Sequence, residues 1–133
     1  MEKKTQISIM LVNEPGELGT VAKLMARAKV NIEALAINDG AHHGVLKMVV
    51  DNEDAARKAL KKADIQHAVQ PVLAIPLPNK PGALAKLCAK LERKKINIDY
   101  VYGSGCRCSD KCPCDCMIIV SCCDAKALKK ALR

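Results

Sequence analysis

Aromatic residues and long apolar runs are what this sequence lacks. Its 133 residues include no Phe, no Trp and only two Tyr, and no run of 18 apolar residues occurs. A membrane span needs such a run, so we expect no membrane partner. Residues 1–6 are polar, with no apolar segment behind them that would make a signal peptide. We therefore expect a cytoplasmic protein.

Cysteine is absent from the first half of the chain and dense in the second. All eight cysteines lie in residues 72–133, which also hold 12 Lys/Arg against 5 Asp/Glu, a net charge of +7. Residues 1–71 hold 10 Lys/Arg against 9 Asp/Glu, a net charge of +1. Cytoplasmic cysteines are kept reduced, so reduced thiols or a bound metal are favoured over structural disulfides.

The chain contains two copies of one pattern. Residues 13–18 (NEPGEL) recur at 79–84 (NKPGAL) with an offset of 66, whereas blocks further downstream recur with an offset of 72. The difference of six indicates extra residues inside the second copy, where the cysteine-rich segment lies. We predict two domains, 1–71 and 72–133, with a cysteine-rich insertion at about 104–116 in a strand-to-strand hairpin of the second copy.

Each copy shows the same succession of strand and helix patterns. In the first copy, apolar residues alternate over 7–11, a Pro-Gly turn follows, and apolar residues at helical spacing begin at Leu18. Two strands joined by a turn at 39–43, a second helix at 53–62 and a short strand complete the order βαββαβ. The second copy ends within its second helix. We predict an α+β fold of two ferredoxin-like antiparallel sheets, the second lacking its last strand.

The missing strand bears on assembly. In a sheet of this kind the first strand lies between the third and the fourth, so residues 72–77 would form an edge. Pro76 fits an edge because proline lacks the N–H that a sheet ladder needs. Unpaired edges recruit partners. We therefore predict a homodimer with the second copy at or near the interface.

The strand, the N-x-P-G-x-L turn, and the helix that ends in [VI]-N-I before the next strand occur twice and resemble the ACT domain, a ferredoxin-like regulatory fold. The resemblance implies domains that pair and bind an amino acid at their interface, usually to control an enzyme. No Ser/His/Asp set, phosphate loop or carboxylate pair is evident in the sequence. We expect a stand-alone regulatory module and not an enzyme; the sequence does not name the enzyme that it would regulate.

The repeated motif carries the candidate ligand site. The start of a helix leaves N–H groups free, which attract a carboxylate, and an Asn side chain offers both a donor and an acceptor. The alternative is that Asn and Pro-Gly only shape the turn. The resemblance implies ligand-binding roles for Asn13, Glu14, Gly16, Leu18, Asn38 and Asp39 in the first copy and for Asn79, Gly82 and Leu84 in the second.

The cysteine-rich segment follows the spacing C-x-C-x3-C-x-C-x-C. Thiolates spaced in this way can reach one soft metal ion. The spacing matches neither the common zinc-ribbon pattern nor the ferredoxin pattern. Zinc, another thiophilic metal and an iron–sulfur cluster all stay open, as do a redox switch and an inert loop. The candidate metal ligands are Cys106, Cys108, Cys112, Cys114 and Cys116.

Two other functions compete with amino-acid binding. A metal sensor or thiol–metal store on an ACT scaffold is the first. Nucleic-acid binding is the second, because RNA-recognition domains share this strand order and the second half of the chain is basic. Such domains stack bases on aromatic residues of the sheet, and this chain offers only Tyr100 and Tyr102. The sequence argues against nucleic-acid binding.

Overall fold

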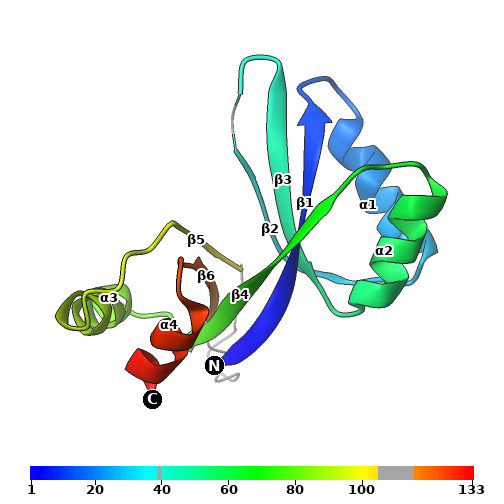
Figure 1. Cartoon of the computed structure of the whole chain (residues 1–133). Helices are drawn as coiled ribbons and strands as arrows, with labels where there is room; N and C mark the ends of the chain where they lie inside the picture. Colours follow the sequence, from blue (N-terminus) through cyan, green and yellow to red (C-terminus); the bar gives the residue numbers. More distant parts are fainter. Residues whose placement is uncertain (39, 105–115) are drawn as a thin grey trace. The chain divides into compact units, whose positions relative to one another are not determined.

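The structure, a computed structural model, describes residues 1–38, 40–104 and 116–133 (Figure 1). Helices and strands follow the order that the repeat predicts, except that the last strand of the first copy and the first strand of the second copy form one continuous strand, Ala68–Leu77. They are β1 (Glu2–Val12), α1 (Glu17–Arg27), β2 (Ile32–Asn38), β3 (His43–Val50), α2 (Glu53–Lys62), β4 (Ala68–Leu77), α3 (Ala83–Arg93), β5 (Tyr100–Gly103), β6 (Cys116–Ser121) and α4 (Ala125–Leu132). Of the helices described here, none is long and apolar enough to cross a membrane.

The contacts divide the chain into two compact units. The first unit is Thr5–Gln70, and the second unit is Pro71–Arg133 together with Met1–Lys4. In the first unit the strands lie in the order β2-β3-β1, and in the second in the order β4-β6-β5. All of these pairs are antiparallel. The predicted α+β class, with antiparallel ferredoxin-like sheets, is confirmed.

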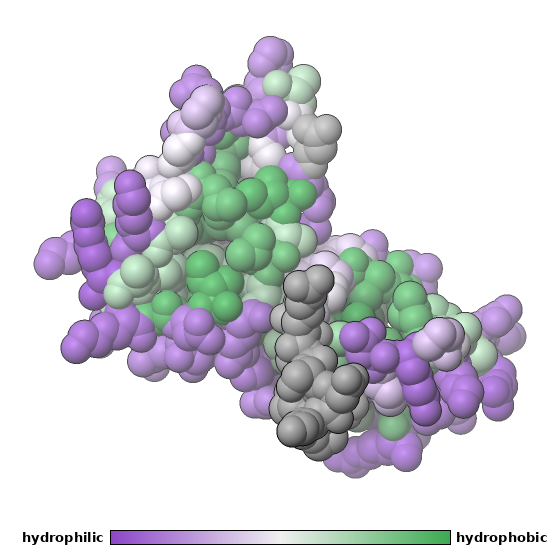
Figure 2. Space-filling view, turned by 180° about the vertical axis from the view of Figure 1, so that it is seen from behind, coloured by the Kyte–Doolittle hydropathy of each residue, from purple (hydrophilic) through white to green (hydrophobic). Residues whose placement is uncertain are grey.

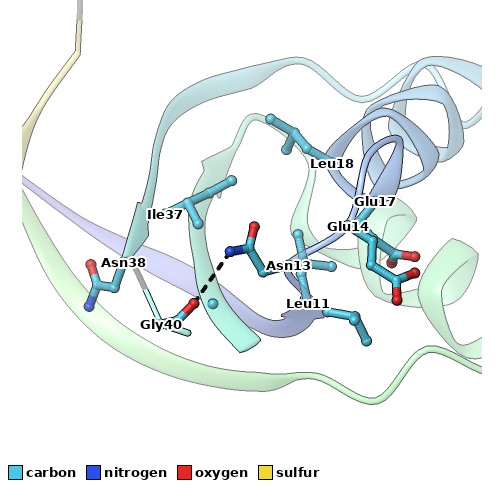
Figure 3. A pocket seen from close by; sticks show the side chains of 10 residues that line it. Leu11, Asn13, Glu14, Glu17, Leu18, Ile37, Asn38 and Gly40 are labelled. Carbon is cyan, nitrogen blue, oxygen red and sulfur yellow. Dashed lines mark hydrogen bonds between the residues drawn. The ribbon is translucent and has the colours of Figure 1, made fainter. Parts of the chain in front are cut away.

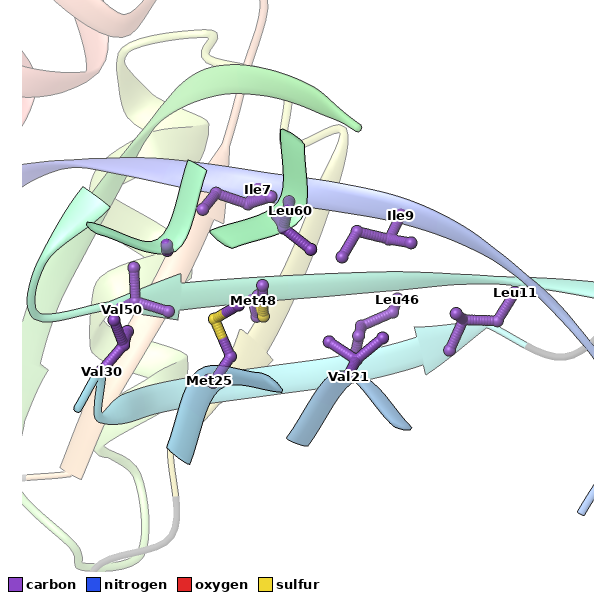
Figure 4. Packing of buried hydrophobic residues seen from close by; sticks show 11 residues of the cluster. Ile7, Ile9, Leu11, Val21, Met25, Val30, Leu46, Met48, Val50 and Leu60 are labelled. Atoms are coloured by element: carbon purple, nitrogen blue, oxygen red, sulfur yellow. The ribbon is translucent and has the colours of Figure 1, made fainter. Parts of the chain in front are cut away.

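The core of the first unit lies between one face of its sheet and both of its helices. Ile7 and Ile9 alternate inward from β1, as the two-residue period of a strand requires. Val21 and Met25 stand four residues apart in α1 and point at the same sheet face, where Met25 lies against Met48 of β3 (Figure 4). Each of these side chains is at most 2 % exposed. Full burial of a side chain of this size stabilises a fold by about 1.5–3 kcal/mol.

The core of the second unit repeats this arrangement. Leu73 and Ile75 of β4 pack with Val120 of β6, and Leu87 of α3 and Leu128 of α4 cover them. Helices α3 and α4 therefore bury one apolar stripe each against a single face of the sheet. The apolar alternation and the helical spacing that the sequence shows are the direct cause of this packing.

The prediction that residues 72–77 form an edge of the sheet is wrong, because β4 lies between two other strands. β1 is eleven residues long and begins at Glu2, well before the apolar alternation that marks it in the sequence. Its first residues belong to the second unit, because Met1–Lys4 make their contacts there. Within the second unit the start of β1 therefore neighbours β4, whose other neighbour is β6. The chain supplies its own strand where the sequence predicted a gap.

Candidate functional site

The two N-x-P-G motifs form equivalent turns. Gly16 precedes α1 with φ 88° and ψ −9°, and Gly82 precedes α3 with φ 84° and ψ −10°. Both conformations lie in the left-handed region, which residues with a Cβ adopt only at a free-energy cost. No atom lies within 4 Å of a Cβ built on either glycine. The requirement for glycine is thus a requirement of the backbone and not of close packing.

The four helices of the described residues start in two different ways. Asn52 caps α2 with Oδ1, which accepts from the backbone N of Ala55 at 3.1 Å. Asp124 caps α4 with Oδ1, which accepts from the backbone N of Lys126 at 3.0 Å and of Ala127 at 2.9 Å. Within the described ranges no side chain caps α1 or α3, the helices that follow the glycine turns. The first N–H of each of these helices donates to a carbonyl of the turn, that of Glu17 to Glu14 at 3.4 Å and that of Ala83 to Lys80 at 3.3 Å. The next N–H groups of the first turn have no side-chain cap, and the helix dipole there favours an anionic acceptor.

A cavity of about 200 Å³ lies beside the start of α1. Asn13 stands at its centre: the side-chain Nδ2 donates to the carbonyl of Gly40 at 3.4 Å (Figure 3), and the backbone N donates to the carbonyl of His42 at 2.8 Å. Two loops that are remote in sequence are joined by these bonds. The cavity is lined by Leu11, Val12, Asn13, Glu14, Glu17, Leu18, Ile37, Asn38, Gly40 and Gly44.

The lining has an apolar part and a charged part. Leu11 is buried, whereas Leu18 and Ile37 are 38 % and 44 % exposed and present apolar surface at the mouth of the cavity. Glu14 and Glu17 both line the cavity, and their side chains lie on the same side of the view in Figure 3. A carboxylate pair attracts a cationic group, and the uncapped helix start attracts an anionic one. The cavity therefore suits a small zwitterion.

The residues predicted from the motif of the first copy come together only in part. Gly16 shapes the turn without lining the cavity. Asp39 lies outside the described residues. The four predicted residues that do line the cavity are Asn13, Glu14, Leu18 and Asn38.

Sequence reasoning missed four of the side chains that line the cavity, those of Leu11, Val12, Glu17 and Ile37. Glu17 occupies the variable position of the motif, Ile37 precedes a predicted residue, and Leu11 was assigned only to a strand. Alternation along the two strands could have placed Leu11 and Ile37 on one face of the sheet. No local pattern shows that both strands end at the same cavity.

The motif of the second copy does not build the same site. Gly82 repeats the left-handed turn. Asn79 and Leu84 do not line the cavity beside α1 or a second cavity beside α3, and Leu84 is 50 % exposed. Their predicted roles in ligand binding stay predictions.

The predicted metal ligands fall almost entirely outside the described residues. Only Cys116 is described; it begins β6 and is half-buried with a free thiol. In the described ranges, no three His, Cys, Asp or Glu side chains are grouped so that they could hold a metal ion. The metal site therefore stays a prediction. Its other proposed ligands are Cys106, Cys108, Cys112 and Cys114.

Two cysteines follow β6 in different surroundings. Cys122 packs against the core of the second unit, and this burial raises the pKa of its thiol. A backbone hydrogen bond at Asp124 lowers the pKa in part, whereas the carboxylates of Asp99 and Asp124 raise it. Cys123 is exposed, and its Sγ donates to Oδ1 of Asp99 at 3.5 Å. A raised pKa keeps the Cys122 thiol protonated and unreactive at neutral pH.

The chain matches the protein family described as "ACT domain pair" over residues 3–107. This chain thus belongs to that family, and the resemblance on which the ligand site was predicted is confirmed. An ACT domain pair is a regulatory module. No curated protein matches the chain.

Solved structures share the fold over nearly the whole chain. A protein of Bacteroides thetaiotaomicron is 29 % identical with a TM-score of 0.87, covering 98 % of this chain and 86 % of that one. The ligand-free regulatory subunit of aspartate kinase from Thermus thermophilus is 16 % identical with a TM-score of 0.68, covering 98 % and 90 %. The same subunit from Thermus flavus is 16 % identical with a TM-score of 0.61, covering 98 % and 90 %. At 16 % identity, the last two show a shared fold.

Proposed function

We propose that the first unit binds a free amino acid in the cavity beside α1 and that binding controls a partner protein. The observation that carries the proposal is the uncapped start of α1, which adjoins a small cavity lined by both carboxylates and apolar side chains. The regulatory subunits of aspartate kinase share the fold, which supports a regulatory role.

Each end of an amino acid has a counterpart in the cavity. The α-carboxylate accepts from the N–H groups of the first turn of α1, where the helix dipole adds to the attraction. The ammonium group faces the carboxylates of Glu14 and Glu17, and Asn13 adds a neutral donor and acceptor between them. The ligand's side chain lies against Leu18 and Ile37.

The size of the cavity limits the ligand. About 200 Å³ is less than the volume of pockets that take drug-sized molecules. We expect amino acids with small or medium side chains to bind, and large aromatic ones to be rejected. The acidic pair also disfavours ligands whose side chain carries a further negative charge.

A thermal-shift screen of the twenty amino acids at millimolar concentration tests the proposal, because a ligand that binds only the folded state stabilises it by RT ln(1 + [L]/Kd). Asn13→Ala removes a hydrogen-bonding partner of the charged ligand, a contact worth about 1.5–3 kcal/mol, and we expect affinity to fall roughly tenfold or more. Asn79→Ala makes the same chemical change in the other motif, at a residue that does not line the cavity beside α1, and serves as the control.

Absence of any shift with all twenty amino acids would refute amino-acid binding. Equal loss of affinity in Asn13→Ala and Asn79→Ala would refute its location in the first unit. A shift with one amino acid, abolished by Asn13→Ala alone, is the expected result.

We also propose that the module forms a homodimer. Residues 72–77 are not an edge of the sheet, so they do not support a dimer. The support comes from exposed apolar residues of β1. Met10 and Val12 alternate with the inward residues of β1, and Met10 is 72 % exposed. Figure 2 shows hydrophobic residues gathered on the visible face of the first unit, with hydrophilic residues around them. Light scattering should give the mass of a dimer for the native chain and of a monomer for Met10→Glu.

A further inference from the structure

A second cavity, of about 450 Å³, lies in the second unit beside α3 and is not explained by amino-acid binding at the first motif. Its floor is apolar. Ile75 of β4 and Leu87 of α3 are each only 7 % exposed, and the half-buried Leu77 and Leu132 complete the floor. Side chains from one strand and two helices thus leave an apolar hollow between them.

The rim of this cavity carries three cations. Lys86 and Lys90 stand four residues apart in α3, so they lie one above the other on the same side of the helix. Lys80, in the loop before α3, is the third, and all three are exposed. Among the described residues that line the cavity none is acidic. The positive charges are therefore not neutralised within the cavity and attract an anion.

The two copies have diverged in charge at this place. With the offset of the repeat, Lys80 stands where the first copy has Glu14, and Ala83 stands where it has Glu17. Both replacements line the second cavity, as both glutamates line the first. The charged group that would attract an ammonium group in the first unit is thus replaced by one that attracts an anion.

We propose that the second cavity binds an amphipathic carboxylate, a molecule with an apolar aliphatic body and a negatively charged head. The body lies on the apolar floor, and the head is held by the three lysines. The volume falls within the roughly 300–1,000 Å³ typical of small-molecule pockets, which favours a small ligand over a macromolecule. The aliphatic lining, without an aromatic ring, favours an aliphatic body over a nucleobase.

Straight-chain carboxylates serve as the probes. Calorimetry measures their binding below the concentration at which they form micelles. Affinity should rise by about two- to fourfold with each buried methylene from hexanoate to decanoate, the upper value being that of full burial. Decylammonium has the same body with the opposite charge and should bind at least about tenfold more weakly. Raising the salt concentration should weaken decanoate binding, because exposed charges are screened.

A pair of charge reversals locates the site. Lys86→Glu with Lys90→Glu should weaken decanoate binding at least about tenfold, since two attractions become repulsions. Lys126→Glu with Lys130→Glu makes the same change at the same spacing on α4, away from this cavity, and should leave the affinity nearly unchanged. All four lysines are exposed, so both double variants should fold, which circular dichroism checks.

Three results would overturn the proposal. The first is no saturable binding of decanoate at millimolar concentration by the folded native chain. The second is equal affinity for decanoate and decylammonium. The third is equal weakening by the two double variants. Asn13→Ala should leave decanoate binding unchanged, so the outcome is independent of the amino-acid site.

Discussion

Replacing Gly16 or Gly19 by alanine, one at a time, separates two effects of glycine near the start of α1. One is its tolerance of a left-handed backbone, and the other is its low helix propensity. Gly16 has φ 88°, whereas Gly19 lies inside the helix. A Cβ built on either residue has no atom within 4 Å. Neither substitution therefore creates a clash, and any difference in stability between the two variants comes from the backbone conformation.

The two variants should change stability in opposite directions. A residue with a Cβ pays about 1–2 kcal/mol in the left-handed region. Alanine also reduces the conformational entropy of the unfolded chain, which stabilises the fold by about 0.4–1 kcal/mol. Gly16→Ala should therefore lower the free energy of unfolding by roughly 0.5–1 kcal/mol. Gly19→Ala should raise it by about 0.8–1 kcal/mol, because alanine is the better helix former. The free energies of unfolding of the two variants should thus differ by about 1.3–2 kcal/mol.

Urea denaturation followed by circular dichroism measures this difference. On heating, about 1 kcal/mol corresponds to roughly 4–8 °C for a domain of 60–100 residues. Gly82→Ala repeats the strained substitution before α3, where φ is 84°, and should also destabilise. If Gly16→Ala proved as stable as Gly19→Ala, the left-handed turn would not be what the motif glycine provides, and the reasoning would fail.

Three further predictions concern the second unit. Asp124→Ala removes the cap of α4 and should lower the free energy of unfolding by about 1 kcal/mol, measured in urea. Because burial raises the pKa of Cys122, its thiol should react with iodoacetamide more slowly than exposed Cys88, and mass spectrometry should show the reverse order only if Cys122 is not buried. The pKa of the Cys122 thiol is higher in the folded state than in the unfolded state. Its contribution to the free energy of unfolding is therefore fully present below the unfolded-state pKa and is lost as the pH rises through the folded-state pKa. Cys112→Ser with Cys114→Ser should release any metal from protein purified without oxygen, and metal analysis that finds none in the native chain would remove the site.

Local patterns determined much of what the sequence predicted. The alternation around Ile7 and Ile9 indicates a strand covered on one face, because successive side chains point to opposite sides. Gly16 and Gly82 mark the same turn twice, because a left-handed backbone favours glycine. These signals depend on only a few neighbouring residues, so they can be recognised in the sequence without the structure.

Only the tertiary structure decided which residues meet. Asn38 at the end of β2 joins Asn13 at one cavity because β1 and β2 both pair with β3, and no local pattern encodes that register. Met1–Lys4 join the second unit, so the sheet edge expected there does not exist. Leu132 meets Lys86 at the other cavity because α3 and α4 pack on the same face of a sheet. Contacts between residues remote in sequence depend on how the whole core packs. Local sequence patterns do not encode that packing.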